Sequence, residues 1–232
     1  MIAVFALAKR TDVSLWLVLP DHPAGLFAET LRRFVFRRKL KIDVPDDIAV
    51  NGAFAAPIRA QGAVLDEAEA EAEAAIELDA GGDGGPRMCR IGPPAAEDPA
   101  LQAAWQVADL RHGLPRLPAS QREQWTPQQL ALDRLSAYSV KKGCYPGQEI
   151  VARTHFLGKA KRSLQCFSSD NPVTDGSPVR ENERDVGEVV CTAPDDAGSV
   201  LLAVMPLEHA GTDLIADGHL LTRQPLLDGL RR

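Results

Sequence analysis

The chain has 232 residues, 45% of them hydrophobic and 25% charged, and its formal net charge is −6 at pH 7. This is a globular composition, with enough residues for a sizeable core or for two to three small domains. The negative charge argues against bulk nucleic-acid binding, which needs an excess of Lys and Arg to neutralise phosphates. No apolar run reaches the length of about 18 residues that a membrane span requires, so we expect no span.

The first residues predict two strands joined by a turn. Residues 1–7 and 15–19 are the expected strands, with residues 9–12 as the turn. In the second strand, Leu alternates with Trp and Val, which predicts burial on both faces. No basic residue precedes the first apolar run and no small-residue cleavage site follows it, so we expect a strand and not a signal peptide.

A helix and a third strand should follow this pair. Asp21 is the expected helix cap. A strand over residues 48–55 would complete a β-β-α-β order, which suggests half of a ferredoxin-like unit. One apolar stripe of the helix consists of Phe27, Leu31, Phe34 and Val35.

Residues 62–97 give a weak signal. Their Ala/Glu run has high helix propensity but no clear apolar face, so a helix and an acidic loop are equally compatible with it. The glycine cluster that follows predicts a mobile connection.

Two further helices are expected before residue 136. Asp98 and Pro99 form a cap followed by proline at the first helical position. Residues 126–129, TPQQ, form a capping box, and we expect that helix to continue toward Leu135. The apolar face expected for the first helix consists of Leu101, Ala104, Trp105 and Ala108.

The pattern of apolar residues and turn residues changes after Lys161. Short apolar runs such as SLQCF and SVLLAVM are separated by Gly, Pro, Asp and Asn. This pattern predicts a small antiparallel barrel or sandwich. Cys166 and Cys191 lie in such runs and are expected in the core.

Residues 141–162, KKGCYPGQEIVARTHFLGKAKR, are the most informative stretch. Cys144 lies between two glycines and beside a proline, which predicts a tight loop that presents the thiol. The pattern becomes helical from Gln148, with Glu149 and Arg153 at the favourable i,i+4 spacing. A helix start and nearby lysines favour thiolate, so Cys144 is the candidate reactive group. The alternative is a half-buried structural cysteine.

Other residues near Cys144 permit two interpretations each. His155 is a candidate base for the thiol, or a surface residue near a helix end. A basic group could hold an anionic tail or a partner, or could form a solvated rim. This group consists of Arg153, Lys159, Lys161 and Arg162.

The segments KGCYPGQE and VARTHFLGKAKRSL resemble the K-G-C-Y-x-G-Q-E signature of the YgfZ family and its continuation. The resemblance implies the fold of the glycine-cleavage aminomethyltransferase. We therefore expect an α+β protein with ferredoxin-like, folate-binding domains and a small C-terminal antiparallel β-barrel. The expected domains are 1–97, 98–158 and 159–232. The resemblance also implies further residues before Met1, so the first domain is expected to be truncated.

The resemblance further implies a tetrahydrofolate site. Cys144 would be its catalytic residue. The segment WQVADLRHGLP resembles a family helix in which a tryptophan lies against folate, although on spacing alone Trp105 is a core residue. The aminomethyltransferase has an acidic residue at the position of Arg111. The expected folate-binding residues are Trp105, Lys142, Gly143, Tyr145, Gln148, Glu149 and Arg153.

The implied function is that of a folate-binding accessory protein for the assembly or repair of iron–sulfur enzymes, including tRNA thiomethylation. The expected partners are a reduced folate and client enzymes such as a tRNA thiotransferase. One alternative is a folate-dependent aminomethyl or one-carbon transferase, and another is an interaction module without folate. The four cysteines show no metal-ligand spacing, so we expect no metal site and a reducing cytoplasm as the compartment. We also expect a monomer.

Overall fold

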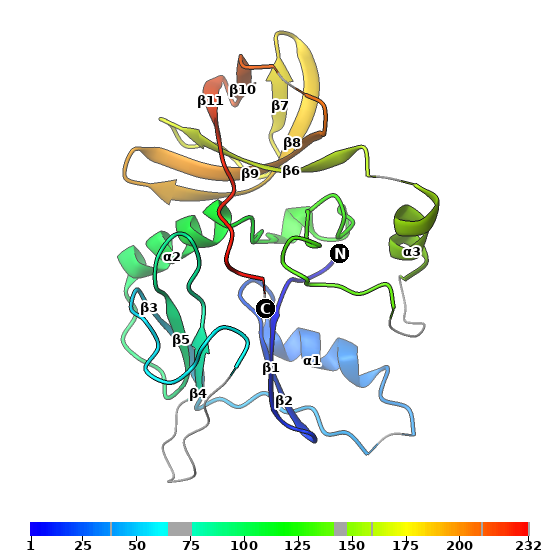
Figure 1. Ribbon diagram of the computed structural model, residues 1–232, viewed down its shortest axis with the longest axis vertical. Coiled ribbons are helices and arrows are strands. Elements are labelled where there is room, and N and C mark those ends of the chain that lie inside the picture. Colours follow the sequence, from blue (N-terminus) through cyan, green and yellow to red (C-terminus); the bar gives the residue numbers. More distant parts are fainter. Residues whose placement is uncertain (38, 65–75, 142–147, 159, 210, 232) are drawn as a thin grey trace. The chain divides into compact units, whose positions relative to one another are not determined.

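The computed structural model describes residues 1–37, 39–64, 76–141, 148–158, 160–209 and 211–231 (Figure 1). The chain divides into two compact units. The larger unit contains Met1–Ile2, Gly82–Gly85 and Asp98–Arg232, and the smaller one contains Ala3–Gly81 and Pro86–Glu97. Among the described residues, no helix combines the length and apolar character needed to span a membrane.

The smaller unit contains two antiparallel sheets and one helix. Strands β1 and β2 form a two-stranded sheet, and the other sheet has the order β3-β5-β4. The expected β-β-α-β order is present, and its ferredoxin-like arrangement stays a prediction. The elements are β1 (Ala6–Thr11), β2 (Ser14–Val18), α1 (Ala24–Arg32), β3 (Ala49–Ala53), β4 (Ile76–Asp79) and β5 (Met88–Gly92).

The first hairpin differs from its prediction in register. Strand β1 continues to Thr11, which pairs with Ser14, so the turn is Asp12–Val13 and not residues 9–12. Lys9 closes this turn through a 2.6 Å contact with the Asp12 carboxylate. The prediction that both faces of the second strand are buried is also wrong, because Leu15 is 61% exposed.

Helix α1 is shorter than its apolar stripe suggests. Pro23, and not Asp21, is the N-cap, and no side chain caps the helix there. Phe27 is buried and packs against the ring of Phe5 at 5.8 Å between centroids. The helix ends at Arg32, so Phe34 lies beyond it and is 62% exposed.

Strands β4 and β5 were missed by sequence reasoning. Glu77 of β4 is 1% exposed and accepts hydrogen bonds from the backbone N–H groups of Ile58 and Arg59, each at 3.1 Å. Its other carboxylate oxygen accepts from Arg90 at 3.0 Å. Burial alone would raise the pKa of Glu77, but these hydrogen bonds outweigh it and lower the pKa. Glu77 thus fixes the loop after β3 to the sheet. The Ala/Glu run before β4 falls mostly on residues 65–75, outside the described residues.

The larger unit contains a closed six-stranded antiparallel barrel with the order β10-β11-β6-β9-β8-β7, which confirms the barrel prediction. Its elements are α2 (Pro99–Arg111), the 3-10 helix η1 (Ala119–Gln121), α3 (Gln148–Leu157), β6 (Arg162–Ser169), β7 (Pro178–Glu181), β8 (Arg184–Asp195), β9 (Gly198–Pro206), β10 (Leu214–Ala216) and β11 (His219–Gln224).

Strand β9 is buried on both faces. Leu201, Ala203 and Met205 fill the barrel interior. The alternate residues Val200, Leu202 and Val204 face outward but are also at most 2% exposed. Helix α2 packs on β8 and β9 in the same unit, which accounts for this second buried face (Figure 1).

Cys166 and Cys191 lie on this outer face of the barrel. Both pair with Leu202 of β9, one from each neighbouring strand. Each is 1% exposed, so the prediction that they are core residues is confirmed. Burial raises the pKa of the Cys166 thiol to about 11.

The start of α2 is as predicted, but its buried face is not. The Asp98 carboxylate accepts a hydrogen bond from the Leu101 N–H at 3.0 Å, and Pro99 follows the cap. The residues that α2 buries include Val107 and Leu110, whereas Ala104 of the predicted face is exposed. The position of the barrel selects the buried face, and helical spacing alone does not reveal it.

Candidate functional site

The signature segment leads directly into α3. Helix α3 begins at Gln148, as predicted from the change of pattern there. The predicted site residues before it lie outside the described residues, and their roles stay predictions. These are Lys142, Gly143, Cys144 and Tyr145.

In the described part of α3, the buried Val151 and a hydrogen bond from Gln128 hold the helix to the rest of the larger unit. Val151 is 7% exposed. The Gln128 Nε2 donates to the Val151 carbonyl at 2.8 Å. Glu149 and Arg153 are exposed, and no ion pair joins them in the part of the chain that the structure describes. Both are therefore accessible to a partner or ligand.

His155 lies in the last turn of α3 and is exposed. Its ring meets the Phe156 ring edge-on, with the centroids 4.9 Å apart. His155 is thus a surface residue near a helix end, which is one of the two interpretations of its sequence position. A contact with Cys144 would involve a residue outside the described ranges.

The segment before the signature is capped as predicted but is not a helix. The Thr126 N–H donates to the Gln129 side chain at 3.0 Å, and the Gln129 N–H donates to the Thr126 hydroxyl at 3.3 Å, which is a complete capping box. Ala131 then has φ of 51°, in the left-handed region, so the chain continues as linked turns and the predicted helix is wrong. Leu130 and Leu132 remain buried in these turns.

Trp105 is half-buried on α2. Its side chain is therefore neither a fully enclosed core residue nor a free surface group. Part of the indole remains accessible, as stacking on a flat ligand requires. The folate contact itself stays a prediction.

A buried ion pair, not foreseen from the sequence, fixes the end of this helix. Arg116 and Asp109 approach to 3.2 Å, and their side chains are 18% and 7% exposed. The pair spans the turn at Gly113, whose φ of 71° suits glycine. A buried pair of this kind requires both partners, because a lone buried charge is costly.

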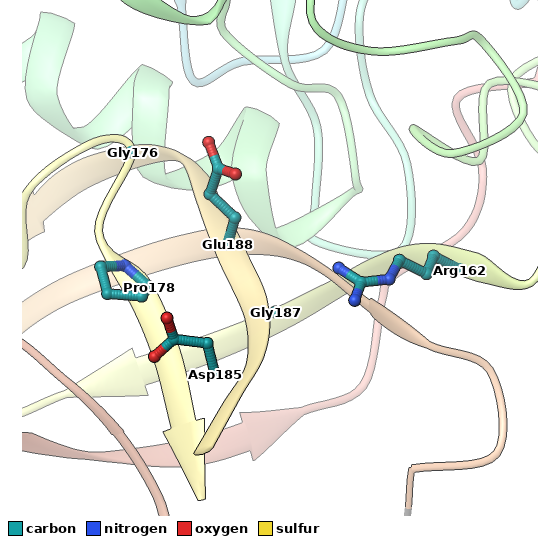
Figure 2. Close-up of a pocket in the computed structure, with 6 residues that line it drawn as sticks. All are labelled: Arg162, Gly176, Pro178, Asp185, Gly187 and Glu188. Carbon is teal, nitrogen blue, oxygen red and sulfur yellow. The ribbon is translucent and has the colours of Figure 1, made fainter. Parts of the chain in front are cut away.

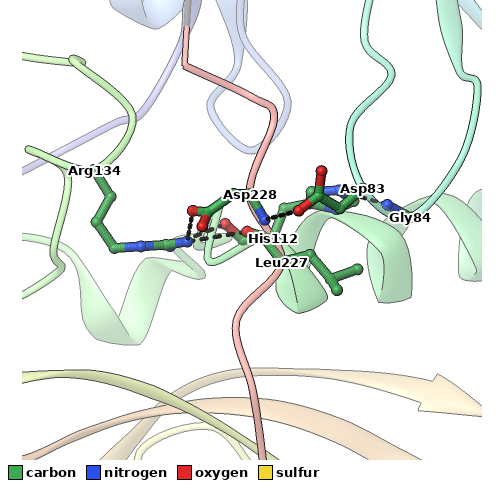
Figure 3. Close-up of polar contacts among 6 residues, drawn as sticks. All are labelled: Asp83, Gly84, His112, Arg134, Leu227 and Asp228. Atoms are coloured by element: carbon green, nitrogen blue, oxygen red, sulfur yellow. Dashed lines mark hydrogen bonds and ion pairs between the residues drawn. The ribbon is translucent and has the colours of Figure 1, made fainter.

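His112, the C-cap of α2, is 1% exposed and has both ring nitrogens engaged (Figure 3). Nδ1 lies 2.7 Å from the Ala108 carbonyl, and the Gly84 N–H donates to Nε2 at 3.3 Å. This pattern assigns a neutral ring with its proton on Nδ1. A Cβ on Gly84 would lie 2.7 Å from His112 Cε1, so the glycine is required for this approach.

The glycine cluster is thus a hydrogen-bonded turn and not the predicted mobile connection. Gly82 and Gly85 form an antiparallel bridge. The Asp83 N–H donates to the Asp228 carbonyl at 3.0 Å, and the Asp228 N–H donates to the Asp83 carboxylate at 3.3 Å. Within the larger unit, the C-terminal segment therefore holds this turn in place through these hydrogen bonds (Figure 3).

Arg134 fastens the same C-terminal segment from the other side (Figure 3). Its guanidinium donates to the carbonyls of His112 at 3.3 Å and Leu227 at 3.0 Å, and pairs with the Asp228 carboxylate at 2.7 Å. The Leu227 N–H donates to the Arg111 carbonyl at 2.9 Å. The end of α2, the glycine turn and the C-terminal segment thus form one network.

A cavity of about 230 Å³ lies on the barrel, and none of its lining residues is a predicted folate residue (Figure 2). Its walls come from β6, β7, β8 and the turn before β7. The lining residues are Arg162, Gly176, Pro178, Asp185, Gly187 and Glu188. Of these, sequence reasoning had identified only Arg162, as part of a basic group.

Comparison with known proteins finds similarity to proteins of one name. No family model matches the chain. It is 35% identical over 107 residues to the tRNA-modifying protein YgfZ of Colwellia psychrerythraea, covering 44% of this chain and 33% of that protein. The protein of the same name from Enterobacter sp. is 33% identical over 132 residues, covering 53% and 40%. That from Cronobacter sakazakii is 36% identical over 109 residues, covering 44% and 33%.

The chain is thus similar to YgfZ proteins over about half of its own length. The match extends over about a third of the length of the first YgfZ relatives. The KGCYPGQE resemblance and the C-terminal barrel agree with this similarity.

Sequence reasoning missed the network around His112 for a physical reason. The order Arg111, His112, Gly113 marks a helix end and could have indicated a capping histidine. Its distant partners Arg134 and Asp228 carry no local signal, because the contact depends on where the C-terminal segment runs.

Proposed function

We propose that this chain takes part in tRNA modification as a folate-binding accessory protein for iron–sulfur enzymes. The observation that carries the proposal is its similarity to curated proteins named tRNA-modifying protein YgfZ, at 32–36% identity. The KGCYPGQE segment with its single cysteine supports the same role. The proposed arrangement retains the ferredoxin-like domains, and the proposed compartment is the cytoplasm.

Tetrahydrofolate is the proposed cofactor, and the described residues are compatible with it. Such a cofactor supplies a flat pterin ring and a carrier for one-carbon units. The half-buried Trp105 could stack on the pterin, because part of its ring stays accessible on a helix fixed by Asp109 and Arg116. Exposed Arg153 and Lys161 could contact an anionic glutamate tail.

An indirect role in tRNA modification fits the charge better than direct modification. A net charge of −6 is unfavourable for holding tRNA by its phosphates. A permanently bound iron–sulfur cluster commonly needs four thiolates at one site. Among the described residues, no group of three or more His, Cys, Asp or Glu could hold a metal ion. We therefore propose that the protein acts on a cluster-bearing client such as a tRNA thiotransferase.

Cys144 is the proposed reactive residue at that step. Cys166 and Cys191 are each 1% exposed, and burial raises the pKa of Cys166 to about 11, so Cys166 stays a neutral thiol at neutral pH. Cys89 is half-buried in β5 of the smaller unit. The glycine-flanked loop remains the setting that best suits thiolate chemistry.

The transferase alternative would need a carboxylate near the folate. The buried carboxylate of α2, Asp109, is already paired with Arg116. This pairing disfavours Asp109 as a free base or electrostatic partner of the cofactor. Release of methylene-tetrahydrofolate from an aminated substrate by the purified chain would nevertheless support the transferase.

A complementation experiment tests the accessory role. Deletion of the gene should lower the activity of several iron–sulfur enzymes and reduce thiomethylated tRNA together. Wild-type protein should restore both, whereas Cys144→Ala should restore neither at equal protein level. Purified protein that modified tRNA with no thiotransferase present would contradict the accessory role.

A further inference from the structure

The cavity on the barrel has charged side chains from the two strands on either side of β9. Glu188 of β8 pairs with Val204 of β9, and Arg162 of β6 pairs with Pro206 two residues further along β9. Directly paired residues of antiparallel strands point to the same face. Arg162 and Glu188 therefore project from the outer face of the barrel, across β9 from each other. Figure 2 shows the Arg162 guanidinium extending toward Gly187 and Glu188.

The charged side chains of Arg162 and Glu188 form no ion pair with each other. No ion pair within 4.0 Å joins Arg162 to any carboxylate of the described residues. Asp185, on the third wall, is occupied by Arg180, whose Nε donates to it at 2.7 Å. Among the described lining residues, Arg162 is thus a cation without an ion pair, and Glu188 supplies a carboxylate without one.

A buried relay orients Glu188. The Trp125 indole N–H donates to the Gln121 side-chain oxygen at 2.8 Å, and the Gln121 Nε2 contacts Glu188 Oε1 at 3.5 Å. Gln121 is 3% exposed and Trp125 is 8% exposed. Because the indole holds the amide oxygen, the Gln121 NH2 group is turned toward Glu188. The second carboxylate oxygen of Glu188 has no hydrogen bond to the described residues.

Two glycines are required by close packing next to the cavity, one beside the relay and one over the barrel interior. A Cβ on Gly176 would lie 2.9 Å from the Gln121 Nε2, and a Cβ on Gly187 would lie 2.1 Å from the Met205 sulfur. Gly176 also has φ of 84°, which favours glycine. A side chain at Gly176 would displace Gln121 of the relay, and one at Gly187 would displace Met205 in the barrel interior.

We propose that this cavity binds a small zwitterion, with its carboxylate on Arg162 and its ammonium group on Glu188. A ligand carrying both charges satisfies both walls, whereas a simple amine or a simple acid leaves one wall unpaired. The volume is below the roughly 300–1,000 Å³ of sites for drug-sized ligands, so the ligand has the size of an amino acid. The site is independent of the proposed folate and client roles, and it gives Arg162 a role apart from the rest of the basic group.

The test is a titration of the full chain with zwitterions of increasing length, namely glycine, β-alanine and γ-aminobutyrate. Butylamine and butyrate serve as analogues with a single charge. The signal is the NMR shift of the Trp125 indole N–H, which reports on Glu188 through Gln121, together with the amides of Gly176 and Gly187. We expect at least one zwitterion to bind about tenfold more tightly than either single-charge analogue, because only a zwitterion makes charge-assisted hydrogen bonds to both Arg162 and Glu188.

Two charge-removing variants locate the binding. Arg162→Gln and Glu188→Gln should each weaken zwitterion binding about tenfold with the barrel intact. Arg184→Gln and Glu183→Gln are matched controls, because these exposed residues lie at the β7–β8 turn and do not line the cavity. The controls should bind as the wild type does.

Three outcomes would overturn the proposal. Butylamine binding as tightly as γ-aminobutyrate would make the cavity a plain cation site. Equal weakening by Arg184→Gln and Arg162→Gln would indicate a nonspecific charge effect. Absence of binding by every zwitterion in a folded wild-type protein would show that the cavity takes no such ligand.

Discussion

Arg134 and Asp228, 94 residues apart in the chain, meet in a 2.7 Å ion pair that joins the turns before the signature segment to the C-terminal segment. Their side chains differ in exposure, at 27% for Arg134 and 79% for Asp228. Because Arg134 also donates to two backbone carbonyls, the two partners are not equivalent. The arginine should contribute more to stability than the aspartate.

Arg134→Met should therefore lower the free energy of unfolding by about 2 kcal/mol, because it leaves two carbonyls without their charged donor. Asp228→Asn should cost less than about 1 kcal/mol, as is usual for an exposed ion pair. Urea denaturation of both variants measures the difference. Equal effects of the two substitutions would mean that the carbonyl contacts add nothing.

Gly84→Ala should destabilise the protein by about 1–3 kcal/mol, because the new Cβ would lie 2.7 Å from Cε1 of the buried His112 ring. Gly25→Ala is the matched control. Gly25 lies in α1 with nothing within 4 Å of an added Cβ, so alanine should stabilise by about 0.5–1 kcal/mol. Circular dichroism during urea denaturation distinguishes the two. If Gly84→Ala left the free energy of unfolding unchanged, the glycine turn would accommodate the added Cβ without loss of stability.

Cys144 should react with a thiol probe at neutral pH faster than the other three cysteines. Cys166 and Cys191 are shielded by α2 and the barrel, and the raised pKa of Cys166 leaves it protonated. Timed alkylation followed by peptide mass spectrometry ranks the four residues. Labelling of Cys144 no faster than that of Cys166 would reject the reactive-thiol role.

The same buried thiol predicts a loss of stability in alkaline solution. The folded pKa of Cys166 is about 11, above the ordinary thiol value of 9.0. Between these values the unfolded chain is deprotonated first, so the free energy of unfolding falls as pH rises through this window. Cys166→Ala should be less stable at pH 8 but should show a shallower decline from pH 9 to 11. Parallel declines in the two proteins would contradict the raised pKa.

Trp105→Ala should weaken tetrahydrofolate binding by about 1–3 kcal/mol if the pterin stacks on the indole. Trp16→Ala is the control, since Trp16 lies in β2 of the smaller unit. Calorimetric titration gives both affinities. Tight binding that is unaffected by Trp105→Ala would place the folate elsewhere.

The parts of the fold that sequence reasoning predicted correctly have local causes. The Asp98 cap and the Thr126 capping box depend on residues a few positions apart. The barrel could be predicted because its strands are short apolar runs separated by turn residues. The buried thiols Cys166 and Cys191 followed from those runs.

The parts that escaped prediction depend on distant partners. Val107 and Leu110 are buried, in place of the predicted stripe of α2, because the barrel packs on that side. The contacts of His112 and the cavity at Glu188 likewise depend on chain segments that no local pattern brings together. For the candidate site, the start of α3 at Gln148 was predictable, while the loop with Cys144 falls on residues 142–147, outside the described residues.

The double burial of β9 has a consequence for the order of assembly. Residues 199–205, SVLLAVM, are all buried, so this strand has no polar side that could remain in water before the barrel closes. Such uncharged, β-prone segments aggregate readily when exposed. The partner that can shield it soonest is β8, which precedes it across the short turn between Asp195 and Gly198. Early formation of this hairpin during synthesis would cover one edge of the most aggregation-prone strand while α2, made before it, is already available for its outer face.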